Sequence, residues 1–244
     1  MSQISALETS ALDTRVPALL RELEGKSIVE SLTLLAAEFE GQIAFSSSLG
    51  IEDQLITHYI FENNLPIRVF SLDTGRLFNE TYTLLHKTNQ HYGKNIEVFF
   101  PQHEAVERLV TEKGTLSFYN SIENRKECCY IRKVEPLKRA LQGVKLWVTG
   151  IRAEQSDARH DLQLLEWDPG FQTIKYNPLL DWSFEGVREA VKELHIPYNP
   201  LHDKGFVSIG CAPCTRAIAE GEDFRAGRWW WESNSKKECG LHAR

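Results

Sequence analysis

The stretch QIAFSSSLGIED, residues 42–53, combines a short apolar run, a serine-rich loop and the first residues of an amphipathic segment. The run at 42–47 has the composition of a buried strand. Residues 52–63 carry apolar side chains at helical spacing: Leu55, Ile56, Tyr59 and Ile60. The stretch therefore predicts a strand that leads through a polar loop into a helix.

The same alternation continues along the chain. Further strands are predicted at residues 66–72, 96–100 and 145–149, and further helices at 79–92, 104–112 and 184–194. The turn Asp168-Pro169-Gly170 joins segments 162–167 and 173–176 in a predicted hairpin. Strands that alternate with helices form βαβ units, so we predict an α/β fold, a mostly parallel sheet with helices on both faces.

The chain divides by composition into three parts. Residues 1–40 are predicted to form an N-terminal helical segment, and residues 41–200 an α/β domain that binds a nucleotide. Residues 201–244 are irregular and rich in glycine and proline. We expect them to be a loop-rich flap of the same domain.

Ligands of parallel sheets bind at the carboxyl ends of the strands. Here those ends carry residues 46–50, 73–76 and 150–159. The first loop could cradle a phosphate at the helix N-terminus, or be an ordinary capped turn. Glu52 and Asp53 suit the helix dipole, but beside an anion they must face away or hold the loop by hydrogen bonds. Asp73 in the second loop could likewise be only a helix cap.

Composition and charge exclude several classes of protein. The 244 residues carry a net charge of −6, which does not fit a nucleic-acid binder. No apolar stretch approaches the ~18–20 residues that span a bilayer. The N-terminus lacks the basic start and apolar core of a signal peptide, so we expect a cytoplasmic, reducing location and no membrane partner.

Four of the five cysteines fall in two pairs, Cys128-Cys129 and Cys211-x-x-Cys214. Clustered cysteines in a reducing compartment indicate zinc or an iron–sulfur cluster. Zinc sites usually combine two knuckles of spaced cysteines, whereas adjacent cysteines can reach different irons, so we favour [4Fe–4S]. Buried apolar thiols are the alternative. The nearby Lys126, Arg132 and Lys133 could balance the cluster's charge, or form a solvated helix face.

The fifth cysteine, Cys239, lies in KKECGLH, residues 236–242. Neighbouring Lys and His side chains lower a thiol pKa and favour the reactive thiolate. Cys239 is therefore either a nucleophile on a tail or a stray thiol near the end of the chain.

Together these motifs resemble the assimilatory adenosine 5′-phosphosulfate (APS) reductases, within the APS/PAPS reductase family. The resemblance runs from about Gly41 to His242. It is carried by seven segments: SSSLGIED (46–53), LDTGRL (72–77), ECCYIRKVEPL (127–137), GIRAEQSDAR (150–159), CAPCTR (211–216), GEDFRAGRWWWE (221–232) and KKECGLH (236–242).

The resemblance implies a Rossmann-like fold of the adenine nucleotide α-hydrolase type. It also implies reduction of APS to sulfite and AMP. By position, Cys239 is the nucleophile that forms an S-sulfocysteine, which thioredoxin or glutaredoxin then reduces. The resemblance likewise implies that Cys128, Cys129, Cys211 and Cys214 are the ligands of a [4Fe–4S] cluster. A homo-oligomer is possible from the habit of the family.

The resemblance also assigns substrate-binding residues. The phosphate loop matches at Ser47, Ser48 and Gly50, and the adenosine side at Leu72 and Asp73. Lys133 would lie between cluster and substrate. The positions expected to hold the phosphosulfate are Arg159, Arg225, Arg228 and His242. For Trp229-Trp230-Trp231 we favour anchoring of the flap to the sheet domain over stacking on adenine.

Three other functions remain open from the sequence. The four cysteines favour APS over its 3′-phosphorylated form, PAPS, but a PAPS reductase with the same mechanism is the alternative. An ATP pyrophosphatase would carry Ser-Gly-Gly-x-Asp-Ser in the first loop, where this chain has SSSLGIED. A zinc-stabilised binding module is the non-enzymatic alternative.

Overall fold

The computed structural model describes residues 12–155 and 161–232 and contains one sheet of six strands. The strands are β1 (Ile43–Ser46), β2 (Arg68–Leu72), β3 (Glu97–Phe99), β4 (Leu146–Val148), β5 (Leu165–Asp168) and β6 (Thr173–Tyr176). Their order in the sheet is β3-β2-β1-β4-β6-β5. Only the β5–β6 pair among these is antiparallel. The predicted α/β fold and the predicted hairpin are confirmed.

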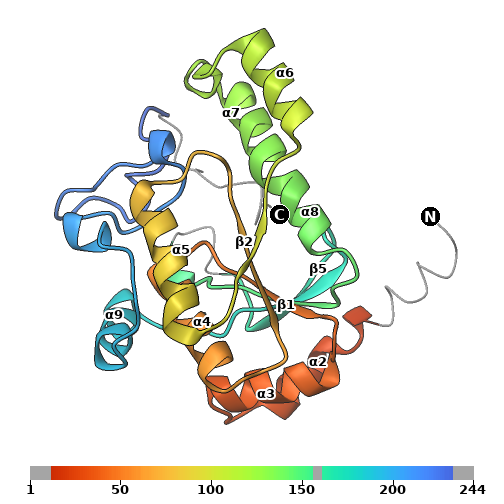
Figure 1. Cartoon of the computed structure of the whole chain (residues 1–244). Helices are drawn as coiled ribbons and strands as arrows, with labels where there is room; N and C mark the ends of the chain where they lie inside the picture. Colours follow the sequence, from red (N-terminus) through yellow and green to blue (C-terminus); the bar gives the residue numbers. More distant parts are fainter. Residues whose placement is uncertain (1–11, 156–160, 233–244) are drawn as a thin grey trace, which may run out of the picture.

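Helices cover both faces of this sheet, as Figure 1 shows. The helices of the described chain are α2 (Val16–Leu23), α3 (Ile28–Glu38), α4 (Ile51–Glu62), α5 (Asn79–Tyr92), α6 (His103–Lys113), α7 (Ile122–Cys129), α8 (Glu135–Ala140) and α9 (Phe184–Glu193). A capping box between Ser27 and Glu30 begins α3. None of the helices in the described parts of the chain is long and apolar enough to cross a membrane.

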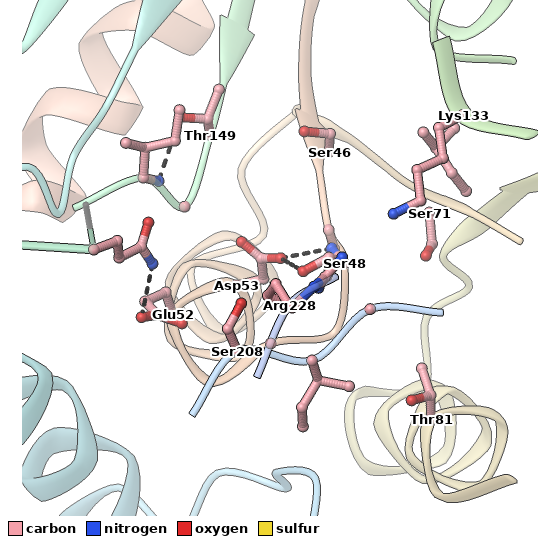
Figure 2. Close-up of a pocket in the computed structure, with 18 of the residues that line it drawn as sticks. Ser46, Ser48, Glu52, Asp53, Ser71, Thr81, Lys133, Thr149, Ser208 and Arg228 are labelled. Carbon is pink, nitrogen blue, oxygen red and sulfur yellow. Dashed lines mark hydrogen bonds between the residues drawn. The ribbon is translucent and has the colours of Figure 1, made fainter. Parts of the chain in front are cut away.

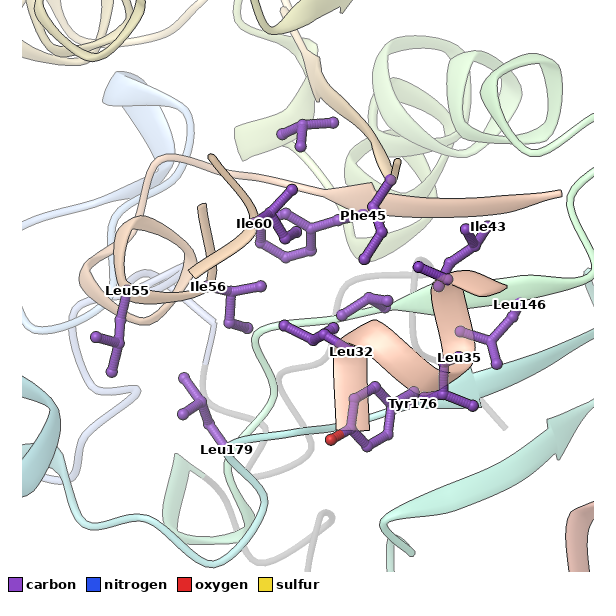
Figure 3. Packing of buried hydrophobic residues seen from close by; sticks show 14 of the residues in the cluster. Leu32, Leu35, Ile43, Phe45, Leu55, Ile56, Ile60, Leu146, Tyr176 and Leu179 are labelled. Carbon is purple, nitrogen blue, oxygen red and sulfur yellow. The ribbon is translucent and has the colours of Figure 1, made fainter. Parts of the chain in front are cut away.

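Alternating side chains of the central strands build two cores. Ile43 and Phe45 of β1 point to one face, where they pack with helices α2, α3, α4, α5 and α9. Figure 3 shows Leu32 and Leu35 of α3 in this larger core. Ala44 points to the other face and packs in a smaller core with Leu137 of α8. Burial on both faces explains why consecutive residues of β1 and β4, such as Ile43, Ala44 and Phe45, are apolar.

A helical arm carries the chain away from the sheet and back (Figure 1). It runs from α6 through a short 3₁₀ turn, Ser117–Tyr119, into α7. A π-helical segment, Tyr130–Val134, then connects α7 to α8. Single π-helical turns inside helices are rare and occur often at functional sites.

The C-terminal segment of the described chain, residues 201–232, returns to the carboxyl ends of the strands. It contains the short turns His202–Lys204 and Ala212–Cys214, and a β-bridge joins Thr215 to Arg228. The backbone N–H of Ala212 donates to the carbonyl of Arg76, in the loop after β2. The irregular character predicted for this segment is confirmed through residue 232.

Candidate functional site

A cavity of about 210 Å³ opens at the carboxyl ends of the neighbouring strands β1, β4 and β2. We call it the strand-end cavity. Three loops of the sheet and the C-terminal segment line it. The residues include Ser46, Ser47, Ser48, Gly50, Ser71, Leu72, Thr74, Lys133, Thr149, Gly150, Ser208, Gly210, Arg225 and Arg228. Several of them are labelled in Figure 2.

The serine-rich loop after β1 forms one wall of this cavity. Leu49 has a left-handed backbone with φ of 61°, which is uncommon for a residue other than glycine. Its N–H donates to the Ser47 hydroxyl at 3.2 Å, and Gly50 then caps α4. The strain at Leu49 is typical of loops shaped around a ligand. Ser47, Ser48 and Gly50, all predicted from sequence, line the cavity together.

Both carboxylates at the start of α4 are engaged by the chain itself. Asp53 Oδ2 accepts hydrogen bonds from the N–H and the hydroxyl of Ser48, at 2.5 and 2.6 Å. Glu52 accepts from Arg152 Nε and Gln155 Nε2, each at 2.9 Å. Asp53 therefore holds the loop, one of the two arrangements that the sequence left open, and Glu52 is paired with a buried arginine.

Burial makes the charged form of Asp53 costly. Its side chain is almost fully enclosed, and this burial raises the pKa of the carboxyl to about 7, against the two hydrogen bonds from Ser48 that lower it. The neighbouring Glu52 raises it further. A methyl group on Gly150 would collide with Asp53 Oδ1, so this position in the loop after β4 has room only for glycine.

The loop after β2 contributes Leu72 and Thr74 to the cavity. Asp73 does not line the cavity. Its Oδ1 accepts hydrogen bonds from the Gly75 N–H at 2.7 Å and from the Tyr82 hydroxyl at 2.9 Å. Asp73 therefore shapes the turn, but it is not the helix cap that the sequence offered as the alternative, because the N-cap of α5 is Phe78. The Thr74 hydroxyl accepts a hydrogen bond from Cys211 Sγ at 3.3 Å.

Three of the cations assigned from sequence line the strand-end cavity: Lys133, Arg225 and Arg228. Figure 2 shows the Lys133 amino group directed into the cavity. Arg228 is only 6% exposed, and its Nε makes no hydrogen bond within the described chain. Its guanidinium stacks 5.0 Å from the centre of the Trp229 ring and fills the space beside Gly210. A buried cation of this kind favours an anionic ligand.

A second, small cavity of about 20 Å³ brings together the two cysteine pairs. Cys128 and Cys129 come from the end of α7, and Cys211 and Cys214 come from the C-terminal segment. None of these four cysteines forms a disulfide. We call this the cysteine cavity. Its other lining residues are Arg76, Phe118, Arg125, Arg132 and Lys133.

Four thiols gathered at one cavity are the residue type that holds zinc or an iron–sulfur cluster. Within the described residues, no three His, Cys, Asp or Glu side chains are close enough to hold one ion. Burial raises the pKa of Cys128, and that of Cys214 to about 12. The surrounding arginines and Lys133 would compensate thiolates bound to a cluster.

The two cavities share a wall. Lys133 lines both of them, and the π-helical segment that contains it begins directly after Cys129. The preceding residue, Arg132, is buried and donates from Nη1 to the Thr74 carbonyl at 2.6 Å. The basic residues after the cysteine pair therefore include buried, structural ones, and the solvated-face interpretation is wrong for Arg132.

The three tryptophans lie on the cysteine side. Trp229 packs with Phe118, Cys211 and Cys214, and Trp231 contacts Tyr119 at a ring distance of 4.4 Å. They do not line the strand-end cavity. The predicted anchoring role is confirmed, but the anchor is the helical arm and not the sheet. A buried ion pair between Arg125 and Glu232, at 2.6 Å, adds to it.

Sequence analysis missed several residues of the site. Arg152 is fully buried and pairs with Glu52, and His202 and Trp147 line the strand-end cavity. Arg152 lies within GIRAEQSDAR, one of the segments that carry the family resemblance, so the sequence held a signal for it. A buried His or Trp cannot be distinguished by sequence from an ordinary core residue. Arg159, Cys239 and His242, which the sequence assigned to the site, lie outside the described residues.

Comparison with known proteins finds relatives over most of the chain. The family model of the phosphoadenosine phosphosulfate reductase domain matches residues 42–217. An adenosine 5′-phosphosulfate reductase of Burkholderia cepacia is 52% identical over 92% of this chain and 90% of its own length. The enzyme of the same name from Allochromatium vinosum is 48% identical over 98% of this chain and 90% of its own length.

Solved structures share the fold. A phosphoadenylyl-sulfate (PAPS) reductase from Candida auris, in a phosphate complex, aligns with a TM-score of 0.69 at 25% identity. The alignment covers 89% of this chain and 98% of that one. An FMN adenylyltransferase of Candida glabrata, in complex with ATP, aligns at 0.51 with 16% identity over 98% of this chain and 76% of its own, which bears on the fold alone.

Proposed function

Since the chain belongs to the phosphoadenosine phosphosulfate reductase family, we propose that it reduces APS to sulfite and AMP in sulfate assimilation. It is an oxidoreductase that acts on a sulfur group. The observation that carries the proposal is the shared wall at Lys133 between the strand-end cavity and a cavity lined by four cysteines.

The strand-end cavity would hold the nucleotide. Ser47, Ser48 and Gly50 offer N–H and hydroxyl donors to a phosphate at the N-terminus of α4. Leu72 would contact the adenosine, and Asp73 would support it by fixing the turn between β2 and α5.

Attack of a thiolate on a sulfate ester brings two anions together. Lys133, Arg225 and Arg228 line the cavity and would lower this repulsion, with Arg159 and His242 as the further cations. Arginine suits the task because its planar donors match phosphate and sulfate oxygens. AMP is a good leaving group, so positioning and charge relief supply most of the catalysis.

Cys239 is the proposed nucleophile. Its sulfur forms a bond to the sulfate sulfur while the bond from that sulfur to the phosphate oxygen breaks, and AMP departs with the electron pair. A thiolate of thioredoxin, or of glutaredoxin, then attacks the Cys239 sulfur and displaces sulfite. The second thiol of the reductant resolves the mixed disulfide, so the two electrons come from a dithiol.

Cys128, Cys129, Cys211 and Cys214 would hold a [4Fe–4S] cluster. Their convergence on one cavity ringed by cations supports this proposal. Through these four ligands, α7 and the C-terminal segment would be tied together, and the bound cluster would supply structural order and charge. Residues 201–244 are accordingly proposed to be part of the same domain as residues 41–200, with residues 1–40 as a helical segment before it.

PAPS is the rival substrate. The two most similar relatives described above are named APS reductases, at 52% and 48% identity, whereas the PAPS reductase structure shares 25%. APS is therefore the proposed substrate. We further propose a cytoplasmic enzyme that binds neither nucleic acid nor membrane and that could form a homo-oligomer.

The test is sulfite and AMP release from APS with reduced thioredoxin. We expect turnover by the wild type, little with PAPS, and none by Cys239→Ser. Retained turnover in Cys239→Ser would refute the mechanism, and AMP release from ATP in place of APS would indicate an ATP pyrophosphatase. A brown protein with broad visible absorption distinguishes the cluster from colourless zinc.

A further inference from the structure

Two donors that the phosphate loop would offer to a ligand, both on Ser48, are already occupied in this structure. Both the N–H and the hydroxyl of Ser48 donate to one oxygen of Asp53, at 2.5 and 2.6 Å (Figure 2). A backbone N–H has one hydrogen to give, so it cannot serve Asp53 and a phosphate fully at the same time. The carboxylate of Asp53 therefore stands where an anionic ligand would bind.

Asp53 has little freedom to leave this position. Its side chain is buried, and its Oδ1 lies so close to Gly150 that a methyl group there would collide with it. Its own helix begins at the same loop, with Gly50 as the cap. A phosphate bound at Ser48 would meet the carboxylate at short range, and two anions in a poorly solvated site repel strongly.

We propose that Asp53 is an internal substitute for the phosphate of the nucleotide, and that binding of the nucleotide transfers one proton from solvent to the Asp53 carboxyl. The protonated carboxyl releases the Ser48 donors and no longer repels the ligand. This inference rests on the nucleotide site of the proposed function. It adds a positioning residue that couples nucleotide affinity to pH.

The pKa of the Asp53 carboxyl in the nucleotide-free structure supports this uptake of a proton. Burial raises it to about 7, so near neutral pH little free energy is needed to add the proton. An approaching anion raises the pKa further, because it disfavours the charged carboxylate.

The other charged groups around the cavity do not share the Ser48 donors. Glu52, on the same helix, pairs with Arg152 from the loop after β4. Burial lowers the pKa of His202, which faces the cavity from its 3₁₀ turn. Lys133, Arg225 and Arg228 face it from the arm and from the C-terminal segment. Asp53→Asn leaves all of these groups unchanged, so its comparison with the wild type isolates Asp53.

The test is calorimetric binding of AMP to the holoprotein between pH 7 and 8.5, in buffers of different ionisation enthalpy. The second pKa of a phosphomonoester is about 6, so AMP is about nine-tenths dianionic at pH 7 and almost entirely so at pH 8.5. We expect the wild type to take up a proton on binding, approaching one per AMP at pH 8.5. Its Kd should rise by up to about tenfold per pH unit above pH 7.

Two variants identify the side chain that takes up the proton. Asp53→Asn keeps the size of the side chain and should bind AMP with no proton uptake and a flat pH profile. Glu52→Gln changes the neighbouring carboxylate, which does not contact Ser48, and should retain the uptake. Binding by the wild type without proton uptake, or uptake that persists in Asp53→Asn, would overturn the inference. The wild-type measurement decides the matter even if a variant fails to fold.

The two proposals fail differently. AMP that binds without proton uptake leaves the nucleotide site intact and removes only the role of Asp53. If AMP does not bind to the folded wild type at all, the nucleotide site of the proposed function is wrong, and this inference falls with it.

Discussion

Arg132 Nη1 donates a 2.6 Å hydrogen bond to the carbonyl oxygen of Thr74 and so joins the wall of the cysteine cavity to a loop of the strand-end cavity. The same threonine accepts from Cys211 Sγ. One residue thus connects the π-helical segment, the loop after β2 and a proposed cluster ligand. Substitutions in the wall of the cysteine cavity should therefore alter nucleotide binding in the strand-end cavity.

Arg132→Met tests this connection. It keeps the apolar stem but removes a buried charged hydrogen bond, which contributes about 1.5–3 kcal/mol. We expect the free energy of unfolding to fall by about 2 kcal/mol and the KM for APS to rise, as measured by urea unfolding and steady-state kinetics. Lys138→Met, at an exposed cation of α8, is the control. Equal behaviour of the two variants would contradict the connection.

Gly210→Ala tests the placement of Arg228. A methyl group at this position collides with the guanidinium, which must then move out of the strand-end cavity. The expected result is weaker AMP binding, measured by calorimetry, with iron content unchanged. In an Arg228→Ala background the same substitution should have little further effect. Additive losses in the double variant would show that Gly210 acts by another route.

Asp53 should also set a pH dependence of stability. The pKa of its carboxyl is 3.8 in the unfolded reference and about 7 when folded, so between these values the folded protein binds more protons. Stability present below pH 4 is therefore lost as the pH rises towards 7. Relative to Asp53→Asn, the free energy of unfolding of the wild type should fall by up to about 1.4 kcal/mol per pH unit. A difference between the two proteins that is constant from pH 4 to 7 would rule this out.

Glu232→Ala removes one partner of the buried ion pair that fixes the end of the described chain. Arg125 and Glu232 are 4% and 6% exposed, so the arginine would be left buried and unpaired. Such losses cost about 3–5 kcal/mol. Thermal unfolding of Glu127→Ala, which breaks the half-exposed Lys113–Glu127 pair, should show a much smaller change. Similar shifts in both variants would contradict a special role for the buried pair.

The spacing of apolar residues predicted the strands and helices of the sheet region well. There, the residues that the local pattern marks as apolar are also the ones that the fold buries. The predicted helix at 79–92 matches α5, and the hairpin at 162–176 appears as β5 and β6. The predicted strand at 66–72 begins later, as β2, and the predicted strand at 96–100 is shorter at both ends, as β3. Strand ends depend on where a neighbouring strand stops pairing, which a single sequence does not contain.

The site was less predictable where position depends on packing between distant segments. The cysteine pairs and the serine loop are visible as motifs. The orientation of Asp73 away from the cavity, and of Arg132 into the protein, depends on partners such as Tyr82 and Thr74. The same holds for Trp229, whose anchor is the helical arm and not the sheet. No local pattern specifies these contacts.

The central claim is that the Cys239 sulfur accepts the sulfo group of APS while AMP departs. The most direct measurement incubates the protein with APS labelled in its sulfate sulfur, without any reductant, and locates the label by peptide mass spectrometry. The account predicts one labelled sulfo group on the peptide that contains Cys239, a matching amount of AMP, and release of labelled sulfite when thioredoxin is added. AMP release without label on Cys239, or equal labelling of Cys239→Ser, would contradict it.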